Sequence, residues 1–109
     1  MRPIPKKLRD EMADDPYYSM CAREVDGGCS GRITWEHAII YAGKQLNEKF
    51  AIIPLCEYHH LGEGLVKEIN VCIALNRATE QELQAISKAI NYQRERDRLN
   101  NLYPQHART

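Results

Sequence analysis

The sequence lacks the long apolar segment that a membrane-spanning helix needs, because it contains no run of about 18 apolar residues. Its first residues, MRPIPKKLRDEMADD, also lack the apolar centre of a secretory signal peptide. We therefore expect a cytoplasmic protein in a reducing compartment. With 109 residues, 43% of them hydrophobic and 28% charged, the composition is that of one small globular domain with terminal extensions.

An excess of charge of one sign is also absent. The 15 Lys and Arg residues balance 15 Asp and Glu residues, so the formal net charge is zero. That balance counts against a broad, non-specific nucleic-acid-binding surface. The charges are unevenly placed, since residues 21–64 are net acidic and the segment from residue 65 onward has more bases than acids. Acidic groups in the middle fit a cation site, and flanking bases could contact phosphates.

The order of elements is predicted from residue patterning. A short polar helix over residues 5–14 ends before Pro16, and glycines mark a loop over residues 21–31. Residues 32–42 and 50–55 are typical of two strands joined by a loop, and a helical turn begins at Cys56. Residues 65–76 have the spacing of a helix with one buried face. Thr79 and Glu82 form a capping-box pattern before one long helix that runs to about residue 103.

Three of the four cysteines and one histidine are candidate zinc ligands. Cys56 and His59 share one face of a helical turn, and the glycine-rich loop could bring Cys21 and Cys29 to them. Without an export signal, metal binding is favoured over two disulfides. The alternative is that the cysteines are reduced core residues and His59 is solvated. Cys72 lies on the apolar face of a predicted helix and is expected in the core.

A second group of candidate ligands comprises Glu36, His37 and His60. Neighbouring residues in a helical turn point about 100° apart, so His59 and His60 are expected to face different sites. A carboxylate and an imidazole can bind a divalent cation, and a neutral imidazole nearby can act as a general base. Alternatively, His37 makes a structural hydrogen bond inside the sheet.

The motifs ITWEHAII and FAIIPLCEYHH, preceded by two cysteines seven residues apart, resemble the HNH, or ββα-metal, endonucleases and especially small phage and prophage members. The resemblance covers about residues 21–64. It implies an α+β fold with a zinc-stabilised ββα-metal core and flanking helices, divided into an N-terminal helical extension (1–20), the core (21–64) and C-terminal helices (65–109).

The resemblance also implies the roles of the site residues. Cys21, Cys29, Cys56 and His59 would hold a structural zinc. Glu36 and His60 would bind a catalytic Mg²⁺ or Mn²⁺, and His37 would be the general base that activates water. The expected partner is DNA, in the cytoplasm of a bacterial host.

Two positions depart from the family pattern. Ala51 stands where the family usually has its middle asparagine, and Asn47 is either a substitute or an ordinary loop residue. Many members have a further histidine at the position of Gly64, and the neighbouring Glu63 is either a helper or a solvated acid.

Three functions therefore remain open: a metal-dependent DNA endonuclease, a non-catalytic zinc module that binds DNA or protein, and a small phage assembly or accessory factor. The alternating charges of residues 94–98 favour an exposed, salt-bridged helix over a phosphate-contacting arm. A homodimer through the C-terminal helices is also conceivable, using an apolar stripe comprising Leu83, Ile86, Ile90 and Leu99.

Overall fold

The computed structural model describes residues 3–41 and 43–107. It has a mixed α+β fold with two small antiparallel sheets, and no helix in the described part is long and apolar enough to cross a membrane. The helices are α1 (Lys6–Ala13), α2 (Glu57–His60), α3 (Lys67–Arg77), α4 (Glu80–Ile86) and α5 (Tyr92–Leu102). The strands are β1 (Ile33–His37), β2 (Ile40–Tyr41), β3 (Lys44–Gln45) and β4 (Ile52–Cys56). The helices expected over residues 5–14 and 65–76 are confirmed as α1 and α3.

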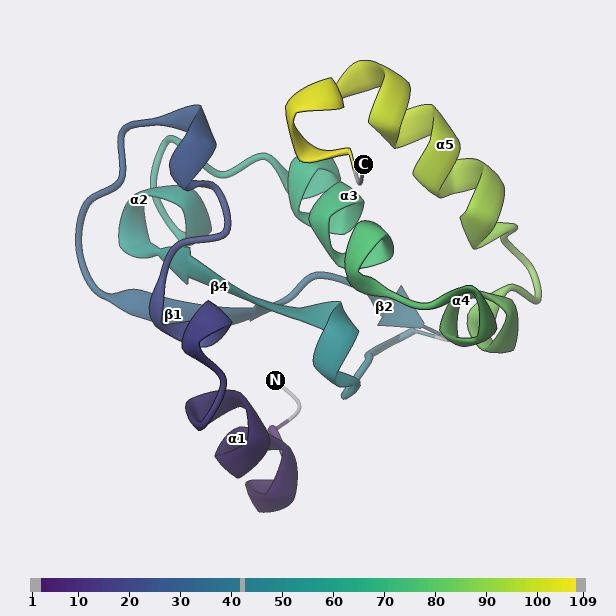
Figure 1. Ribbon diagram of the computed structural model, residues 1–109, viewed down its shortest axis with the longest axis horizontal. Helices are drawn as coiled ribbons and strands as arrows, with labels where there is room; N and C mark the ends of the chain where they lie inside the picture. Colours follow the sequence, from purple (N-terminus) through teal and green to yellow (C-terminus); the bar gives the residue numbers. More distant parts are fainter. Residues whose placement is uncertain (1–2, 42, 108–109) are drawn as a thin grey trace.

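The larger sheet pairs β1 with β4 in antiparallel register, with Ile33 opposite Cys56 and His37 opposite Ile52. Every residue of β4 is buried, because α3 and α5 lie on one side of this sheet and α1 lies on the other (Figure 1). β4 leads directly into α2, the single helical turn that carries both neighbouring histidines. The sheet therefore fixes the position of α2 beside the start of β1.

The prediction of one strand over residues 32–42 and a plain loop to residue 49 is wrong. β1 ends at His37, and the chain then forms a second small sheet from β2 and β3. The reason is that Ile39 is only 2% exposed, so the chain turns to bury it in the core. The backbone N–H of Ala38 donates to the carbonyl of Ala51 at 2.8 Å, which holds this turn against the other strand.

The prediction of one long C-terminal helix is also wrong. The capping box at Thr79 and Glu82 is present and starts α4, but α4 ends at Ile86 and α5 begins at Tyr92. The hydroxyl of Ser87 donates to the Leu83 carbonyl and accepts the backbone N–H of Tyr92, while Asn91 caps α5 by accepting from the N–H of Arg94. Side-chain hydrogen bonds of this kind compete with a continuous helix.

The break folds α5 back against α3 (Figure 1) and builds the main core between these helices and β4. Leu83, Ile86 and Leu99 of the predicted apolar stripe are buried in this core, at 0%, 8% and 1% exposure. These three side chains therefore pack against other residues of the same chain. A homodimer through the C-terminal helices stays a prediction. A smaller cluster of Met12, Tyr18 and Ile52 attaches α1 to the other face of β4.

Candidate metal centre and its surroundings

Cys21, Cys29, Cys56 and His59 come together in a cluster that could hold a metal ion such as zinc. Their ligand atoms all lie within 4.8 Å of one another. The Nδ1 atom of His59 lies 3.5, 3.6 and 3.2 Å from the sulfur atoms of Cys21, Cys29 and Cys56. A tetrahedral zinc with ordinary Zn–S and Zn–N bonds would separate sulfur from nitrogen by about 3.5 Å. The three nitrogen-to-sulfur distances thus match those expected around a tetrahedral zinc.

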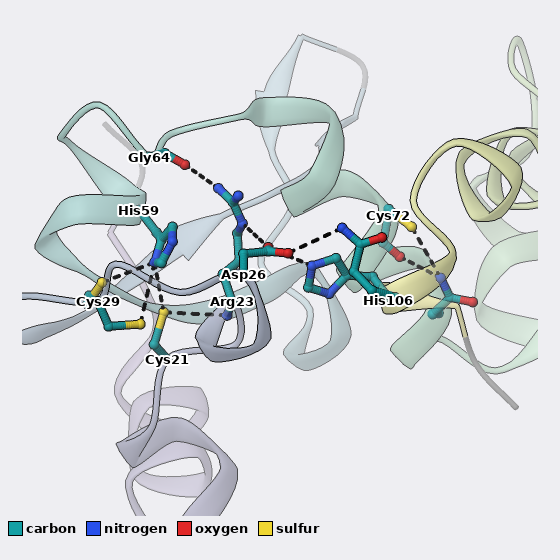
Figure 2. A network of polar contacts seen from close by, with 11 residues as sticks. Cys21, Arg23, Asp26, Cys29, His59, Gly64, Cys72 and His106 are labelled. Carbon is teal, nitrogen blue, oxygen red and sulfur yellow. Dashed lines mark hydrogen bonds and ion pairs between the residues drawn. The ribbon is translucent and has the colours of Figure 1, made fainter.

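Two separate segments deliver these ligands. Cys56 ends β4 and His59 lies in α2, whereas Cys21 and Cys29 belong to the loop before β1 (Figure 2). The loop turns back at Gly31, whose φ of +83° favours glycine and where a Cβ atom would lie 2.8 Å from the Cβ of Glu57. The conformation of Gly31 therefore lets the loop approach α2 closely enough to close the cluster.

The thiols have different proton affinities. Burial alone raises the pKa of Cys56, but backbone hydrogen bonds from His59 and Ser30 and contacts with His59 and Cys21 lower it to about 6. Burial and the neighbouring thiols raise the pKa of Cys29 to about 12. Thiols this close cannot all become thiolates unless a cation compensates their charge, so the cluster favours a divalent metal.

A buried ion pair attaches the C-terminal segment to the cysteine loop (Figure 2). Arg23, which is 5% exposed, donates to the carboxylate of Asp26 at 2.8 Å and to the carbonyl of Gly64. The same carboxylate interacts with the Nε2 atom of His106 at 2.7 Å and accepts from Gln105 at 3.2 Å. Burial alone raises the pKa of Asp26, but these hydrogen bonds outweigh it and lower the pKa to about 2. The network thus joins the loop, the segment after α2 and the C-terminal segment.

His60 faces a different set of atoms from its neighbour His59. Its Nδ1 atom lies 2.5 Å from the hydroxyl of Thr34, which also contacts the Leu55 carbonyl at 3.0 Å. A carbonyl can only accept, so both contacts are hydrogen bonds only if the hydroxyl donates to Leu55 and Nδ1 of His60 carries a proton. The Nε2 atom then presents a lone pair to the Glu36 carboxylate, whose nearest oxygen is 3.5 Å away.

A positive charge between these two acceptor atoms would be favourable at this distance. A cation with bonds of about 2.1 Å to each atom can bridge them. Without a metal ion, His60 with protons on both ring nitrogens would form a salt bridge with Glu36. The structure thus brings Glu36 and His60 together as the sequence predicted, and a metal ion at this point stays a prediction.

His37 makes a different contact. Its Nε2 atom lies 2.6 Å from the Oδ1 atom of Asn47, and the Nδ2 atom of Asn47 donates to the carbonyl of Pro3 at 3.1 Å. The Pro3 carbonyl fixes which end of the amide faces His37, and Oδ1 can only accept. Nε2 of His37 therefore carries the proton, and Nδ1 keeps the lone pair that a general base requires. His37 therefore donates its hydrogen bond to Asn47, while the side chain of Ala51 is fully buried.

Gly64 also has a structural explanation. A Cβ atom at this position would lie 2.4 Å from the ring of Tyr58 and 2.9 Å from the ring of His59. No larger side chain fits there without moving a candidate zinc ligand. At position 64, where many HNH members have a further histidine, the rings of Tyr58 and His59 leave no room for a side chain. The neighbouring Glu63 is exposed.

No family model, curated protein or solved structure matches this chain. The structure itself shows a cysteine and histidine cluster that could bind zinc on a small α+β fold. The resemblance to HNH endonucleases therefore rests on the sequence motifs.

Sequence reasoning missed three residues of these contacts: Thr34, Pro3 and Arg23. Thr34 is two residues before Glu36 and therefore on the same face of β1. That spacing is the signal that could have found it. The Pro3 carbonyl and the Arg23 guanidinium reach their partners across 44 and 41 residues of sequence, and no local pattern indicates such contacts.

Proposed function

We propose that this protein is a metal-dependent DNA endonuclease of the HNH type, with a ββα-metal core built from β1, β4 and α2. The observation that carries the proposal is the approach of the Glu36 carboxylate to the Nε2 atom of His60, which lie 3.5 Å apart. This pair would bind the cation, and His37, which follows Glu36 in β1 and lines the same cavity, would offer its Nδ1 atom as the base. Soft sulfur ligands on one side of α2 and a carboxylate on the other suit two different metals, zinc and Mg²⁺ or Mn²⁺.

The zinc cluster would have a structural role. Four protein ligands leave no position open for water or substrate, as in structural zinc sites. By fixing α2 against the cysteine loop, the cluster would hold His60 opposite Glu36 and keep the second site in register. Sites supported on rigid elements in this way keep the geometry that hydrolysis needs.

In the reaction, Nδ1 of His37 would take a proton from a water molecule as the water oxygen attacks the phosphorus atom. The new P–O bond forms as the bond to the 3′ oxygen breaks, which leaves a 5′ phosphate, and the 3′ oxygen takes a proton from solvent water to become a hydroxyl. Asn47 would hold the imidazole in the productive tautomer and orientation. The divalent ion bound at Glu36 and His60 would supply positive charge to the phosphate and the leaving 3′ oxygen.

The test is nicking of a supercoiled plasmid by the zinc-loaded full chain with Mg²⁺ or Mn²⁺. Loss of a positioned general base typically lowers rates by about 10²- to 10⁴-fold, which is the effect we expect for His37→Ala. His106→Ala is the matched control, because it removes another imidazole remote from this pair and is expected to keep the activity. Wild-type protein without metal-dependent nicking, or nicking unaffected by His37→Ala, would contradict the proposal.

A second candidate is a zinc module that binds DNA or protein without catalysis. The glycine at position 64, where many family members have a further histidine, and the zero net charge favour it. This module would hold one zinc per chain and show no magnesium-dependent cleavage. Nicking that depends on His37 would exclude it. A phage assembly or accessory factor would share that behaviour and additionally need a partner protein.

A further inference from the structure

A cavity of about 420 Å³ opens beside the candidate hydrolytic site. Glu36 and His37 line one part of it, and the remaining walls come from the β2–β3 sheet, α3 and α5. Its volume is in the range of small-molecule and cofactor sites. The apolar part of the lining comprises Ile39, Ile40, Val71, Ile90, Tyr92 and Leu99. A group bound in this cavity would therefore lie next to His37.

One polar side chain in the wall of this cavity has no partner. Asn70 of α3 is 1% exposed, and neither its Oδ1 nor its Nδ2 atom forms a hydrogen bond within the described part of the chain. Leaving a buried amide unpaired costs about 1–3 kcal/mol. Both atoms are covered, so a ligand in the cavity would reach them after rotation about the Cα–Cβ bond turns the amide edge towards the cavity. A ligand with an adjacent donor and acceptor would satisfy both atoms.

The charges around the cavity do not form a phosphate-binding groove. Arg98 is already paired with Glu68 and Glu95. Among the described residues Lys67 makes no salt bridge, and it is exposed at the rim. The cavity thus has an aromatic and aliphatic interior and one available cation, Lys67, at its rim. Such a cavity suits a flat, largely neutral ring attached to a single phosphate group better than it suits a length of duplex backbone.

We propose that this cavity accepts one unpaired nucleobase of the strand that is cut at His37, an inference that rests on the proposed endonuclease function. The amide of Asn70 would pair with the donor and acceptor edge of the base, as asparagine does with adenine. Tyr92 and the aliphatic side chains would contact its faces, and Lys67 would contact the adjoining phosphate. A base inside an intact duplex cannot enter a protein pocket, so the substrate would be single-stranded, bulged or branched DNA.

The experiment measures binding by fluorescence anisotropy with the zinc-loaded full chain and no added divalent ion. Three labelled duplexes differ at one position: a single unpaired adenosine, the same unpaired nucleotide without its base, and full pairing. We expect the unpaired adenosine to bind at least fivefold more tightly than either of the others, which is the low end for one stacked base. Equal binding of the first two duplexes would overturn the inference, whatever any variant does.

Asn70→Leu sharpens the test, because replacing an unpaired buried amide by a similar apolar side chain is not expected to lower the melting temperature. It should reduce the preference for the unpaired adenosine to less than twofold. Lys67→Ala is the matched comparison, and it should weaken all three duplexes by a similar factor and keep the preference. An unchanged preference in Asn70→Leu would overturn the role of Asn70 and with it the proposed pocket.

Cleavage of the same duplexes with Mg²⁺ separates this inference from the proposed function. Equal cleavage of all three, with equal binding, would support the endonuclease and overturn the pocket. Preferential binding of the unpaired adenosine without cleavage of any duplex would support the pocket and overturn the hydrolysis.

Discussion

His59 and His60 are neighbours in α2, yet their surroundings differ in ligand type, burial and completeness. His59 is 1% exposed, and its Nδ1 atom faces three sulfur atoms within 3.6 Å. The side chain of His60 is 20% exposed and faces one hydroxyl and one carboxylate. The first set is complete and closed, as in structural zinc sites, and the second leaves positions open, as catalytic metal sites do.

In the proposed function, a single helical turn carries one histidine for a structural zinc and one for a catalytic cation. A rotation of about 100° between consecutive residues sends one imidazole towards the cysteine loop and the other towards β1. A different ring nitrogen faces each set of partners: Nδ1 of His59 faces the three sulfur atoms, and Nε2 of His60 faces the Glu36 carboxylate. Three predictions test whether the two sites are as separate as this comparison implies.

The largest effect is expected on removal of the zinc cluster. Structural zinc contributes about 10 kcal/mol or more of apparent binding free energy in small domains, which exceeds the stability of most of them. Cys56→Ser, or treatment with a strong chelator, should therefore unfold the protein, as measured by circular dichroism and by zinc content. His60→Ala is the matched control and should keep one zinc per chain. A folded Cys56→Ser protein without zinc would show that the cluster is not what holds the fold.

The two sites also differ in how far the sequence predicts them. The zinc ligands follow from residue type and spacing, because a cysteine and a histidine three apart must share a face of α2. The directions of the hydrogen bonds at His37 and His60 do not, since they depend on Asn47, Pro3 and Thr34 in the folded chain. Sequence reasoning thus finds Glu36, His37 and His60 and names Asn47 as a candidate, but it misses Pro3 and Thr34.

The fold shows the same limit. Residue patterning predicted α1, α3 and the β1–β4 strand pair: a polar segment that ends before Pro16, a helix with one apolar face, and two runs rich in apolar residues. It did not predict the break between α4 and α5, where Ser87 and Asn91 make local hydrogen bonds. Nor did it predict the turn after His37, which depends on burying Ile39 against distant segments.

An intermediate effect is expected at Asp26, which ties the C-terminal segment to the zinc side of the molecule. The pKa of Asp26 is lowered from 3.8 to about 2, so its contribution to stability is fully present above about pH 4 and is lost as pH falls towards 2. This shift corresponds to at most about 2 kcal/mol, because solvent screens part of the interaction.

The measurement is urea unfolding of wild type and Asp26→Asn at about pH 7 and about pH 5, both above this window. The variant should be less stable by up to about 2 kcal/mol at both values, since Asp26 is ionised throughout. Asp10→Asn, which removes an exposed carboxylate paired with Lys6, is the control and should cost less than about 1 kcal/mol. A destabilisation that disappears between pH 7 and pH 5 would show that the network does not hold Asp26 ionised.

The smallest effect, and the most specific to the second site, is expected for Thr34→Val. Valine keeps the shape of threonine but cannot accept the hydrogen bond from Nδ1 of His60, so the lone pair is no longer fixed on Nε2 opposite Glu36. Loss of such an orienting contact typically lowers metal affinity by about 10- to 100-fold. We expect Mn²⁺ binding, measured by calorimetry on the zinc-loaded protein, to weaken at least tenfold, or about 1.4 kcal/mol, while one zinc per chain remains. If Thr34→Val instead released zinc, the two imidazoles would not serve separate sites, because a change beside His60 would have reached the cluster at His59.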